Sequence, residues 1–507
     1  MIYFDSGATT LRKPPEVARA MLRAMEQCAS PGRGGHEAAM AAAEAVYDCR
    51  VRAAALFDAQ PEQIVFTMNA THALNMAIRT LVSPGDRVLI SGFEHNAVVR
   101  PLYALGAETV IAGRALFDPD DTLRAFRERL DGGIRAVVCT HVSNVFGYIL
   151  PIGKIAALCR EQGVPLIVDA SQSAGMLPVS LRKLGAAFIA MPGHKGLYGP
   201  QGTGILICGE KPYPLMQGGS GSLSASPRMP DILPDIAEAG THNVCGIAGL
   251  AAGLEFVRRH GIGKIERHEQ RLRKTLERWL REDTDAVVFS GTAQSGVLSF
   301  LLPGEDCEDT ARRLAEQGIA VRAGLHCAPC AHISAGTMQT GTVRVSCKVL
   351  PSTLPLLSCR THGQQPLHHA ILAPAEVVAQ PRIFRVKQVI ARRMRFIGRI
   401  HMERAVVHPC NGLRQGHHPG GRCGVDGRAQ RRSLFTGAHP NGPAQNVRIH
   451  LIQQRVFHRD AAAKHHLFNR CAACRKGIKN TSRPEHHGFQ QRPINLLRAG
   501  LKPQAQQ

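Results

Sequence analysis

Lys195 lies in a glycine-rich segment whose residue types suit covalent chemistry with a flat ligand. It follows a short apolar run and stands in the sequence Met191-Pro-Gly-His-Lys-Gly-Leu-Tyr-Gly-Pro-Gln-Gly-Thr-Gly204. Flanking glycines allow a ligand to approach the backbone, and a lysine removed from water has a lowered pKa and a nucleophilic amine. An isolated segment of this kind is more typical of a surface turn with a solvated lysine. Other parts of the chain must therefore decide its role.

Polar residues at the ends of two other predicted elements suit a ring nitrogen and a phosphate. Asp169 ends the apolar run 165–169, where a carboxylate can pair with a protonated pyridine nitrogen. A helix N-cap is an equally common role for such an aspartate. Ala70 and Thr71 open a predicted helix, whose free amides and dipole attract a phosphate group. A simple threonine cap is the rival interpretation there.

Two further side chains complete a set that matches pyridoxal phosphate (PLP). Gln172 could reach a phenolic oxygen on a ring. His95 follows a strand and could stack on the ring face, although a lone histidine there is more often structural. A desolvated lysine, a partner for the ring nitrogen, a phosphate site and a stacking group are together what this cofactor needs. The combination predicts a PLP enzyme that holds its cofactor on Lys195.

Short apolar runs that alternate with helical stretches must position these residues. Runs typical of buried parallel strands lie at 64–67, 87–91, 136–140, 165–169, 187–191 and 204–208. Helical stretches lie at 71–81, 121–130 and 152–162. The alternation predicts an α/β fold in which a large PLP-binding domain, residues 1–245, has a mostly parallel sheet covered by helices. Ligands of such sheets bind at the carboxyl ends of the strands.

A smaller α+β domain is expected at residues 246–350. A helix at 264–281 places Ile265, Leu272, Leu276 and Trp279 on one face. Strands are predicted at 286–289, 297–302 and 342–346, around a helix at 309–316. We also consider that the N-terminal segment packs on this smaller domain rather than on the large one.

The net charge of +23 is concentrated in a tail, residues 351–507. The tail holds 26 Lys and Arg against five acidic residues, which leaves residues 1–350 at only +2. We interpret the tail as disordered, non-native sequence that follows a reading-frame change near Cys347. A nucleic-acid-binding arm or a metal module with Cys410, Cys423 and a Cys471-Ala-Ala-Cys474 motif are the alternatives. We expect no metal site, and we do not favour nucleic acid as a partner.

Bulk composition favours a cytoplasmic protein without membrane association. No run approaches the roughly 18–20 apolar residues of a membrane span, and the first residues, MIYFDSGATT, show no signal peptide. Fifteen cysteines at scattered spacings suit a reducing compartment.

Seven segments between residue 1 and about residue 346 resemble, in their order, those of the cysteine desulfurases, which are class V aminotransferase-like, fold-type I PLP enzymes. The segments are Tyr3-Phe-Asp-Ser-Gly-Ala-Thr-Thr10, Glu94-His-Asn96, His141-Val-Ser-Asn144, Asp169-Ala-Ser-Gln172, Gly193-His-Lys195, Glu238-Ala-Gly-Thr-His-Asn243 and Arg322-Ala-Gly-Leu-His-Cys-Ala328. The resemblance implies that a homodimer converts L-cysteine to L-alanine and leaves the sulfur as an enzyme persulfide. It implies a sulfur-acceptor protein and a setting such as iron–sulfur cluster assembly. Selenocysteine lyases share the frame, so L-selenocysteine is the alternative substrate.

The resemblance also implies roles for individual residues. Lys195 resembles the Schiff-base lysine and proton shuttle, and Cys327 resembles the nucleophile, for which a small buried thiol is the alternative. The implied cofactor contacts are His95 on the ring face, Asp169 at the pyridine nitrogen, Gln172 at the phenolate, Ala70, Thr71 and His194 at the phosphate, and Thr241 across the dimer. The implied substrate-carboxylate ligands are Asn144, Arg344 and Arg322, and a surface strand arginine is the alternative for Arg344.

The chain departs from the family pattern at several positions. Pro192 stands where many members have Ser or Thr, which predicts one missing phosphate hydrogen bond. Leu325 replaces a common histidine two residues before Cys327, and the pattern stops at Cys347. Cys330 creates a Cys-x-x-Cys spacing, which indicates either a reversible disulfide or a coincidental second thiol. The intact site residues favour an enzyme over a non-catalytic binding protein with a basic arm.

Overall fold

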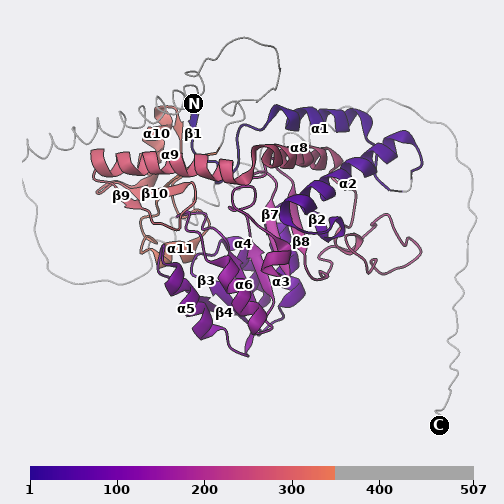
Figure 1. The fold of residues 1–507 in the computed structure, drawn as a ribbon, viewed down its shortest axis with the longest axis horizontal. Helices are drawn as coiled ribbons and strands as arrows, with labels where there is room; N and C mark the ends of the chain where they lie inside the picture. Colours follow the sequence, from indigo (N-terminus) through magenta and orange to yellow (C-terminus); the bar gives the residue numbers. More distant parts are fainter. Residues whose placement is uncertain (33, 349–507) are drawn as a thin grey trace, which may run out of the picture. The chain divides into compact units, whose positions relative to one another are not determined.

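The computed structural model describes residues 1–32 and 34–348. A seven-stranded sheet lies at the centre of their first two thirds, and Figure 1 shows its place among the helices. Its strand order is β2-β8-β7-β6-β5-β3-β4. The strands are β2 (Ile64–Thr67), β3 (Arg87–Ser91), β4 (Glu108–Ala112), β5 (Ile134–Thr140), β6 (Leu166–Asp169), β7 (Phe188–Pro192) and β8 (Gly204–Cys208). Neighbouring strands are parallel except that β8 is antiparallel to both β2 and β7. The expected α/β fold with a mostly parallel sheet is confirmed.

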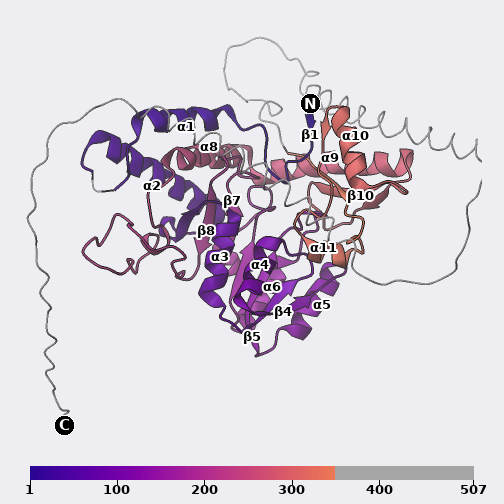
Figure 2. The same cartoon turned by 180° about the vertical axis from the view of Figure 1, so that it is seen from behind.

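Helices cover both faces of this large sheet (Figures 1 and 2). One face packs on α3 (Ala70–Leu81) and α4 (Asn96–Leu105). The other packs on α2 (Glu37–Phe57), α5 (Pro119–Arg129), α6 (Ile152–Glu161), α7 (Leu181–Leu184) and α8 (Val244–His260), with α1 (Pro15–Gln27) against α8 and α2. Along β3, Val88 and Ile90 face the first group of helices and Leu89 faces the second. Burial of both faces explains why the strands are apolar at successive positions.

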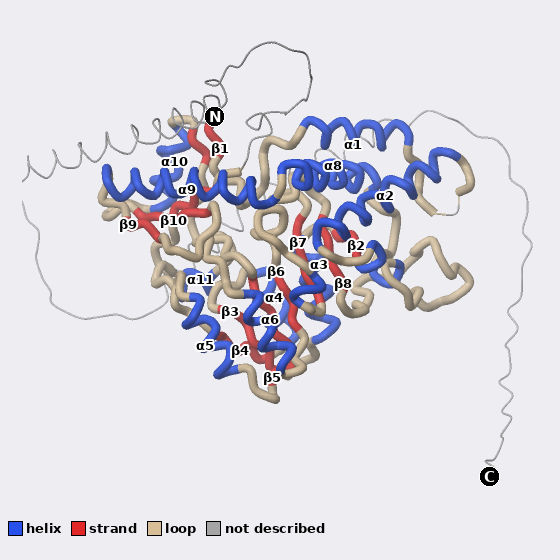
Figure 3. Tube along the Cα trace, viewed as in Figure 1, coloured by secondary structure: helices blue, strands red, loops and turns tan. Residues whose placement is uncertain are grey.

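A smaller antiparallel sheet with the order β12-β10-β9 forms a separate core. It consists of β9 (Val287–Phe289), β10 (Val297–Leu301) and β12 (Val343–Ser346), which pack with α9 (Ile262–Asp283) and α10 (Cys307–Glu316). Figure 3 shows α9 running alongside β9 and β10. Leu276 and Trp279 are buried on the face of α9 that the spacing predicted, and Leu272 is partly buried beside them. The remaining helices are α11 (Pro329–Ser334) and two 3-10 turns, Pro61–Gln63 and Asp235–Ala237.

Two features differ from the expected organisation. Strand β4 was not predicted, because Glu108 and Thr109 are exposed at the edge of the sheet and leave no apolar run. Helix α8 begins at Val244, and its side chains Ile247 and Leu250 belong to the core of the large sheet. Beyond residue 245, the core of the smaller sheet has its first residues in α9, so a division at residue 245 does not coincide with the change of core. The division into domains 1–245 and 246–350 stays a prediction.

The N-terminal segment connects the two sheets. Strand β1 (Ile2–Tyr3) pairs in parallel with β11 (Ile319–Ala320), and Ile2 lies in the core of the smaller sheet. The Gly7 amide donates to Ser346 Oγ at 2.7 Å, and Gln172 Nε2 donates to the Gly7 carbonyl at 2.9 Å. The Thr10 amide then donates to the carbonyl of His194, the neighbour of Lys195, at 3.0 Å. This segment therefore joins β12 to the glycine-rich loop.

Within the part of the chain that the structure describes, no helix is both long enough and apolar enough to cross a membrane. The predictions made for the tail, residues 351–507, including the nucleic-acid and metal alternatives, lie outside the described residues.

Candidate active site

A cavity of about 90 Å³ opens at the carboxyl ends of β5, β6 and β7. It brings together eight of the residues with an expected role, namely Ala70, Thr71, His95, Asn144, Asp169, Gln172, His194 and Lys195. These residues come from five separate parts of the chain, and the parallel strands gather them at one edge, as expected for this type of sheet.

Lys195 is fixed in the cavity by the close packing of its glycine neighbours. A Cβ added to Gly193 would lie 2.2 Å from Thr203 Oγ1, and one added to Gly196 would lie 2.2 Å from the Ala174 carbonyl oxygen. Neither position can hold a larger residue without displacing its neighbours. Burial lowers the pKa of Lys195 to about 8, against the opposing attraction of the Asp169 carboxylate. The enclosed amine is therefore far closer to its neutral, nucleophilic form than a solvated lysine.

Asp169 ends β6 and is almost completely buried. Its Oδ1 accepts a hydrogen bond from the Ser171 amide at 2.9 Å. No helix begins after it, since residues 171–176 form turns, so the alternative role of a helix N-cap is wrong. A buried carboxylate that faces the cavity is suited to pairing with a cationic ring nitrogen.

The N-terminus of α3 forms another wall of the cavity. Its N-cap is Asn69, whose side chain accepts from the His72 amide at 3.0 Å. Ala70 and Thr71 are therefore the first two helical residues, and the alternative of a threonine cap is wrong. Amides in this position have no carbonyl partner within the helix and attract an anion. Asn69, a common N-cap residue type before a helical stretch, could have been recognised in the sequence and was not assigned a role.

Two histidines flank the lysine. His95 is the N-cap of α4, and its Nδ1 accepts from the Ala97 amide at 3.0 Å. Burial is the main cause that lowers the pKa of His95, so the ring is predominantly neutral near pH 7. Burial also lowers the pKa of His194 to about 4. The buried Nδ1 of His194 has no hydrogen-bond partner among the described residues.

Arg344 lies on β12 with only 2% of its surface exposed, so the alternative of a surface arginine is wrong. Its Nη1 donates to the Asn144 carbonyl at 3.0 Å, and its Nη2 donates to Asp5 Oδ1 at 2.8 Å. The same Asp5 carboxylate binds Arg322 at 2.8 Å. Asp5 belongs to a segment that carried the family resemblance, but no local pattern places it beside two arginines 317 and 339 residues away.

The nucleophile candidate Cys327 lies in a strained loop. Cys327 has φ +57° and His326 has φ +49°, a left-handed conformation that side chains other than glycine rarely adopt. The loop is held from two sides, because Asn144 Nδ2 donates to the His326 carbonyl at 2.8 Å and the Asn96 amide donates to the Cys327 carbonyl at 2.8 Å. Cys327 is exposed, so the alternative of a small buried thiol is wrong.

The contact that Gln172 makes differs from the simplest expectation, whereas the place of Thr241 does not. The amide nitrogen of Gln172, expected at a phenolate, donates to the Gly7 carbonyl, although the side chain lines the cavity. Thr241 lies outside the Lys195 cavity and lines another one, of about 230 Å³, with Met68 and His72. Pro192, the residue in place of Ser or Thr, also lines the Lys195 cavity.

A buried acid beside His95 had no expected role. Glu94 Oε1 accepts from Ser91 Oγ at 2.5 Å and from the Thr140 amide at 2.8 Å, while its Oε2 has no hydrogen-bond partner among the described residues. Burial raises the pKa of Glu94 to about 8. The carboxyl group is therefore mostly protonated near neutrality and joins β3 to β5 beneath the cavity.

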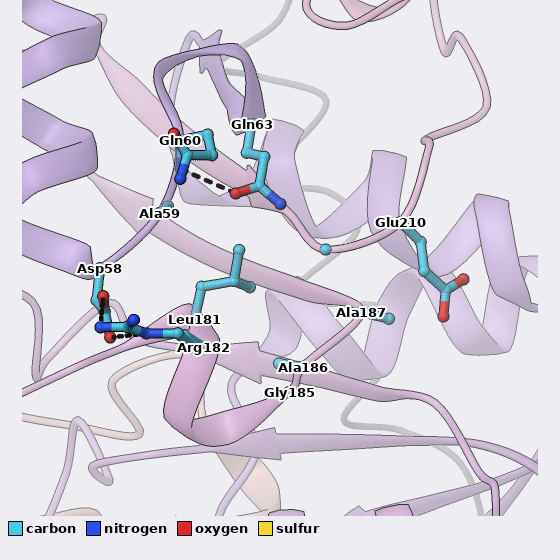
Figure 4. Close-up of a pocket in the computed structure, with 11 residues that line it drawn as sticks. Asp58, Ala59, Gln60, Gln63, Leu181, Arg182, Gly185, Ala186, Ala187 and Glu210 are labelled. Atoms are coloured by element: carbon cyan, nitrogen blue, oxygen red, sulfur yellow. Dashed lines mark hydrogen bonds and ion pairs between the residues drawn. The ribbon is translucent and has the colours of Figure 1, made fainter.

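A larger cavity, of about 450 Å³, lies at the opposite ends of the strands (Figure 4). It is bordered by residues before β2 and β7 and after β8, and Arg182 pairs there with Asp58 at 2.7 Å. None of the residues with an expected catalytic or binding role lines it. The Lys195 cavity is therefore the candidate active site.

Sequence comparisons identify similar proteins. The Aminotransferase class-V family model matches residues 2–351. A probable cysteine desulfurase of Methanothermobacter thermautotrophicus is 34% identical over 359 residues, which cover 68% of this chain and 89% of that protein. A cysteine desulfurase of Escherichia coli O157:H7 is 32% identical over 345 residues, which cover 65% of this chain and 84% of that protein.

Solved structures show the same similarity in three dimensions. The apo structure of a cysteine desulfurase from Thermococcus onnurineus matches with a TM-score of 0.65 and 29% identity, over 77% of this chain and 94% of that one. The Escherichia coli cysteine desulfurase CsdA matches with a TM-score of 0.60 and 28% identity, over 68% of this chain and 89% of that one.

Proposed function

The chain belongs to the class-V aminotransferase family, and on that premise we propose that it is a PLP-dependent cysteine desulfurase that converts L-cysteine to L-alanine. One observation carries the proposal. One cavity contains the amine of Lys195, whose pKa is lowered, together with the buried carboxylate of Asp169 and the N-terminus of α3. A loop that exposes Cys327 lies next to it.

The residues around the cavity fit PLP. The N-terminus of α3 suits the phosphate, and the buried, unpaired Nδ1 atom of His194 is a second group that a phosphate oxygen would satisfy. Asp169 would face the pyridine nitrogen and His95 the ring, with Lys195 as the covalent attachment point. When bound, PLP supplies an electron sink for bond breaking at the substrate's α- and β-carbons.

The chain's own residues would bind the substrate and move its protons. Arg344, with Asn144 beside it, would bind the substrate carboxylate, because its buried Nε has no hydrogen-bond partner among the described residues and charge-assisted hydrogen bonds to a carboxylate are strong. Lys195, with its pKa lowered to about 8, can both accept and return a proton near neutral pH.

Cys327 would perform the sulfur transfer. Its thiolate attacks the sulfur of the bound L-cysteine, a new S–S bond forms, and the C–S bond of the substrate breaks. The carbon takes a proton and leaves as L-alanine, and the enzyme keeps the sulfur as a persulfide. The exposure of Cys327 suits transfer of that sulfur to an acceptor protein, for example in iron–sulfur cluster assembly.

Homodimerisation and a cytoplasmic setting are further parts of the proposal. Thr241 lies outside the Lys195 cavity of its own subunit, which is compatible with its expected contribution to the cavity of a partner subunit. Ten cysteines of the described residues are free thiols, which suits a reducing compartment.

The activity can be tested directly. PLP-loaded protein should release L-alanine from L-cysteine in the presence of a thiol reductant, in a ratio of one alanine to one sulfide. Mass spectrometry of protein quenched without reductant should find one additional sulfur atom on the peptide that contains Cys327. L-Selenocysteine assayed in parallel distinguishes the alternative substrate, and PLP binding without alanine formation from either substrate would reject the proposed function.

A further inference from the structure

We propose that Asp5 sets both the position and the net charge of the carboxylate-binding group formed by Arg344 and Arg322, and so restricts the site to amino acids with uncharged side chains. The inference rests on the proposed function, because it requires Arg344 to bind the substrate carboxylate. It adds a positioning and specificity-determining residue to that site.

Backbone pairing fixes Asp5 beside both arginines. The Arg344 amide donates to the Arg322 carbonyl at 2.7 Å, and the Arg322 amide donates to the Arg344 carbonyl at 3.3 Å. Asp5 forms a parallel bridge with Ser346, two residues beyond Arg344 on the same strand. The backbone of Asp5 is therefore paired with a strand, which fixes the point from which its carboxylate extends.

The carboxylate of Asp5 binds both guanidinium groups at once. Asp5 Oδ1 accepts from Arg344 Nη2 at 2.8 Å, while Asp5 Oδ2 accepts from Arg322 Nε at 3.0 Å and from Nη2 at 2.8 Å. The exposed fractions of the Arg344 and Asp5 side chains are only 3% and 12%, so solvent screens their attraction weakly. The side chain of Arg322 is half exposed.

Arg344 keeps hydrogen-bonding capacity for a ligand. Its Nη1 binds the Asn144 carbonyl and its Nη2 binds Asp5, which together fix the plane of the guanidinium group. Its buried Nε has no hydrogen-bond partner among the described residues. An unsatisfied buried donor costs about 1–3 kcal/mol, so an acceptor supplied by a substrate is favoured at this position.

The charges of the three side chains leave one net positive charge. That charge matches the single α-carboxylate of an amino acid such as cysteine. Hydrogen bonding to Asp5 is the main cause that raises the pKa of Arg322. Arg322 lies five residues before Cys327 in the chain. Asp5 thus pairs with Arg322, the cation of the group that is more exposed and that Arg344 leaves free for a second anion. An anionic side chain would find no unpaired cation there.

The test compares the binding of L-alanine and L-aspartate, which differ by one carboxylate, to PLP-loaded protein. Dissociation constants come from the change that each ligand causes in the absorbance of the bound cofactor. Asp5→Asn removes the charge but keeps the side-chain size. It should lower the dissociation constant for L-aspartate at least tenfold relative to that for L-alanine. Combining Asp5→Asn with Arg322→Gln restores one net charge and should restore the wild-type ratio. Asp131→Asn, which removes an exposed partner of Arg87 (3.1 Å), is the matched control.

An unchanged ratio in Asp5→Asn would overturn the inference, and so would a shift that persists in the double variant. If Asp5→Asn fails to bind PLP, Arg322→Gln alone supplies the test. In that variant Asp5, Arg344 and the uncharged side chain at position 322 have a net charge of zero. The dissociation constant for L-aspartate must therefore rise at least tenfold relative to that for L-alanine, and an unchanged ratio again rejects the role of Asp5. Neither measurement requires desulfuration, so a failure of the proposed function is detected separately by the absence of alanine formation from L-cysteine.

Discussion

The chemistry of single residues in this site depends on how far each is removed from water. Lys195 is enclosed between two glycines that admit no side chain, and its amine loses the hydration that normally keeps a lysine protonated. The environment of Cys327 is the opposite, because its side chain is exposed to solvent on a loop with left-handed backbone dihedral angles. The two reactive groups are thus made available by different means, one by burial and the other by exposure.

The lowered pKa of Lys195 predicts how PLP capture depends on pH. The neutral amine is the reactive form, so the rate at which apoprotein captures PLP should rise as the pH increases through about 8. An unperturbed lysine would show this rise only around pH 10. Stopped-flow absorbance of the captured cofactor across neutral and alkaline pH measures the midpoint. A midpoint near the ordinary lysine value would show that the amine is not desolvated.

Lys195→Ala should abolish both the absorbance and the borohydride trapping of the bound cofactor.

The two neighbouring cysteines should respond differently to substitution. Cys327→Ser should retain PLP binding and lose desulfuration of L-cysteine, because the exposed thiol is the sulfur acceptor. Cys330 is buried, and burial raises the pKa of its thiol, which makes it a poor attacking group. Cys330→Ser should therefore keep PLP binding, desulfuration of L-cysteine and the wild-type sensitivity to oxidation. Oxidative inhibition that reductant reverses in the wild type but that is absent in Cys330→Ser would show that a disulfide between the two does form.

At the scale of elements, local signals were sufficient where an element is buried on both faces. The strands at 64–67, 87–91 and 204–208 agree with the structure to the residue, because a short continuous apolar run between turn residues is typical of a fully buried strand. Local signals failed for β4, which is exposed at an edge, and for α4, which contains Pro101. The cavity residues next to strand ends were predictable from the same strand runs. The partnership of Asp5 with Arg322 and Arg344 was not, because it depends on chain pairing across more than 300 residues.

The N-terminus of α3 allows a test that separates helix stability from cofactor binding. Asn69→Ala removes the N-cap and should lower the free energy of unfolding by about 1 kcal/mol. It should also weaken PLP binding several-fold, since the first turn of α3 lines the cavity. Asp118→Ala removes the N-cap of α5, which lies outside that cavity, and is the matched control. Urea unfolding and PLP titration measure the two effects. Equal losses of PLP affinity in both variants would argue against a phosphate site at α3.

At the scale of the whole molecule, the described residues already contain both cores and the complete candidate site of one subunit. The large sheet supplies the residues of the Lys195 cavity, and strand β12 of the smaller sheet supplies Arg344. The Cys327 loop follows β11, and its neighbour Ala328 packs in the core of the large sheet. The N-terminal segment joins them through backbone pairing. Every residue that lines the Lys195 cavity lies between Asn69 and Lys195, far from the tail in the sequence.

Removal of residues 351–507 should therefore leave PLP binding intact. It should also reduce binding to a polyanion such as heparin, because it removes 26 basic residues and only five acidic ones. Cofactor absorbance and heparin affinity at fixed salt concentration, each compared with the full chain, provide the measurement. A truncated protein that fails to fold, when the full chain folds, would show that the tail contributes to the smaller domain.

The position of Asp5 also sets an order of events during synthesis. Its partner Arg344 follows 339 residues later, which at the usual rate of translation is a wait of about 20 to 70 seconds. Lys195, Asp169 and the α3 N-terminus are all made well before that. A growing chain thus contains every residue that lines its cofactor pocket before it contains the arginine that would recognise a carboxylate. Ribosome-bound chains stopped just short of Arg344 should accordingly capture PLP while still failing to distinguish L-alanine from L-aspartate.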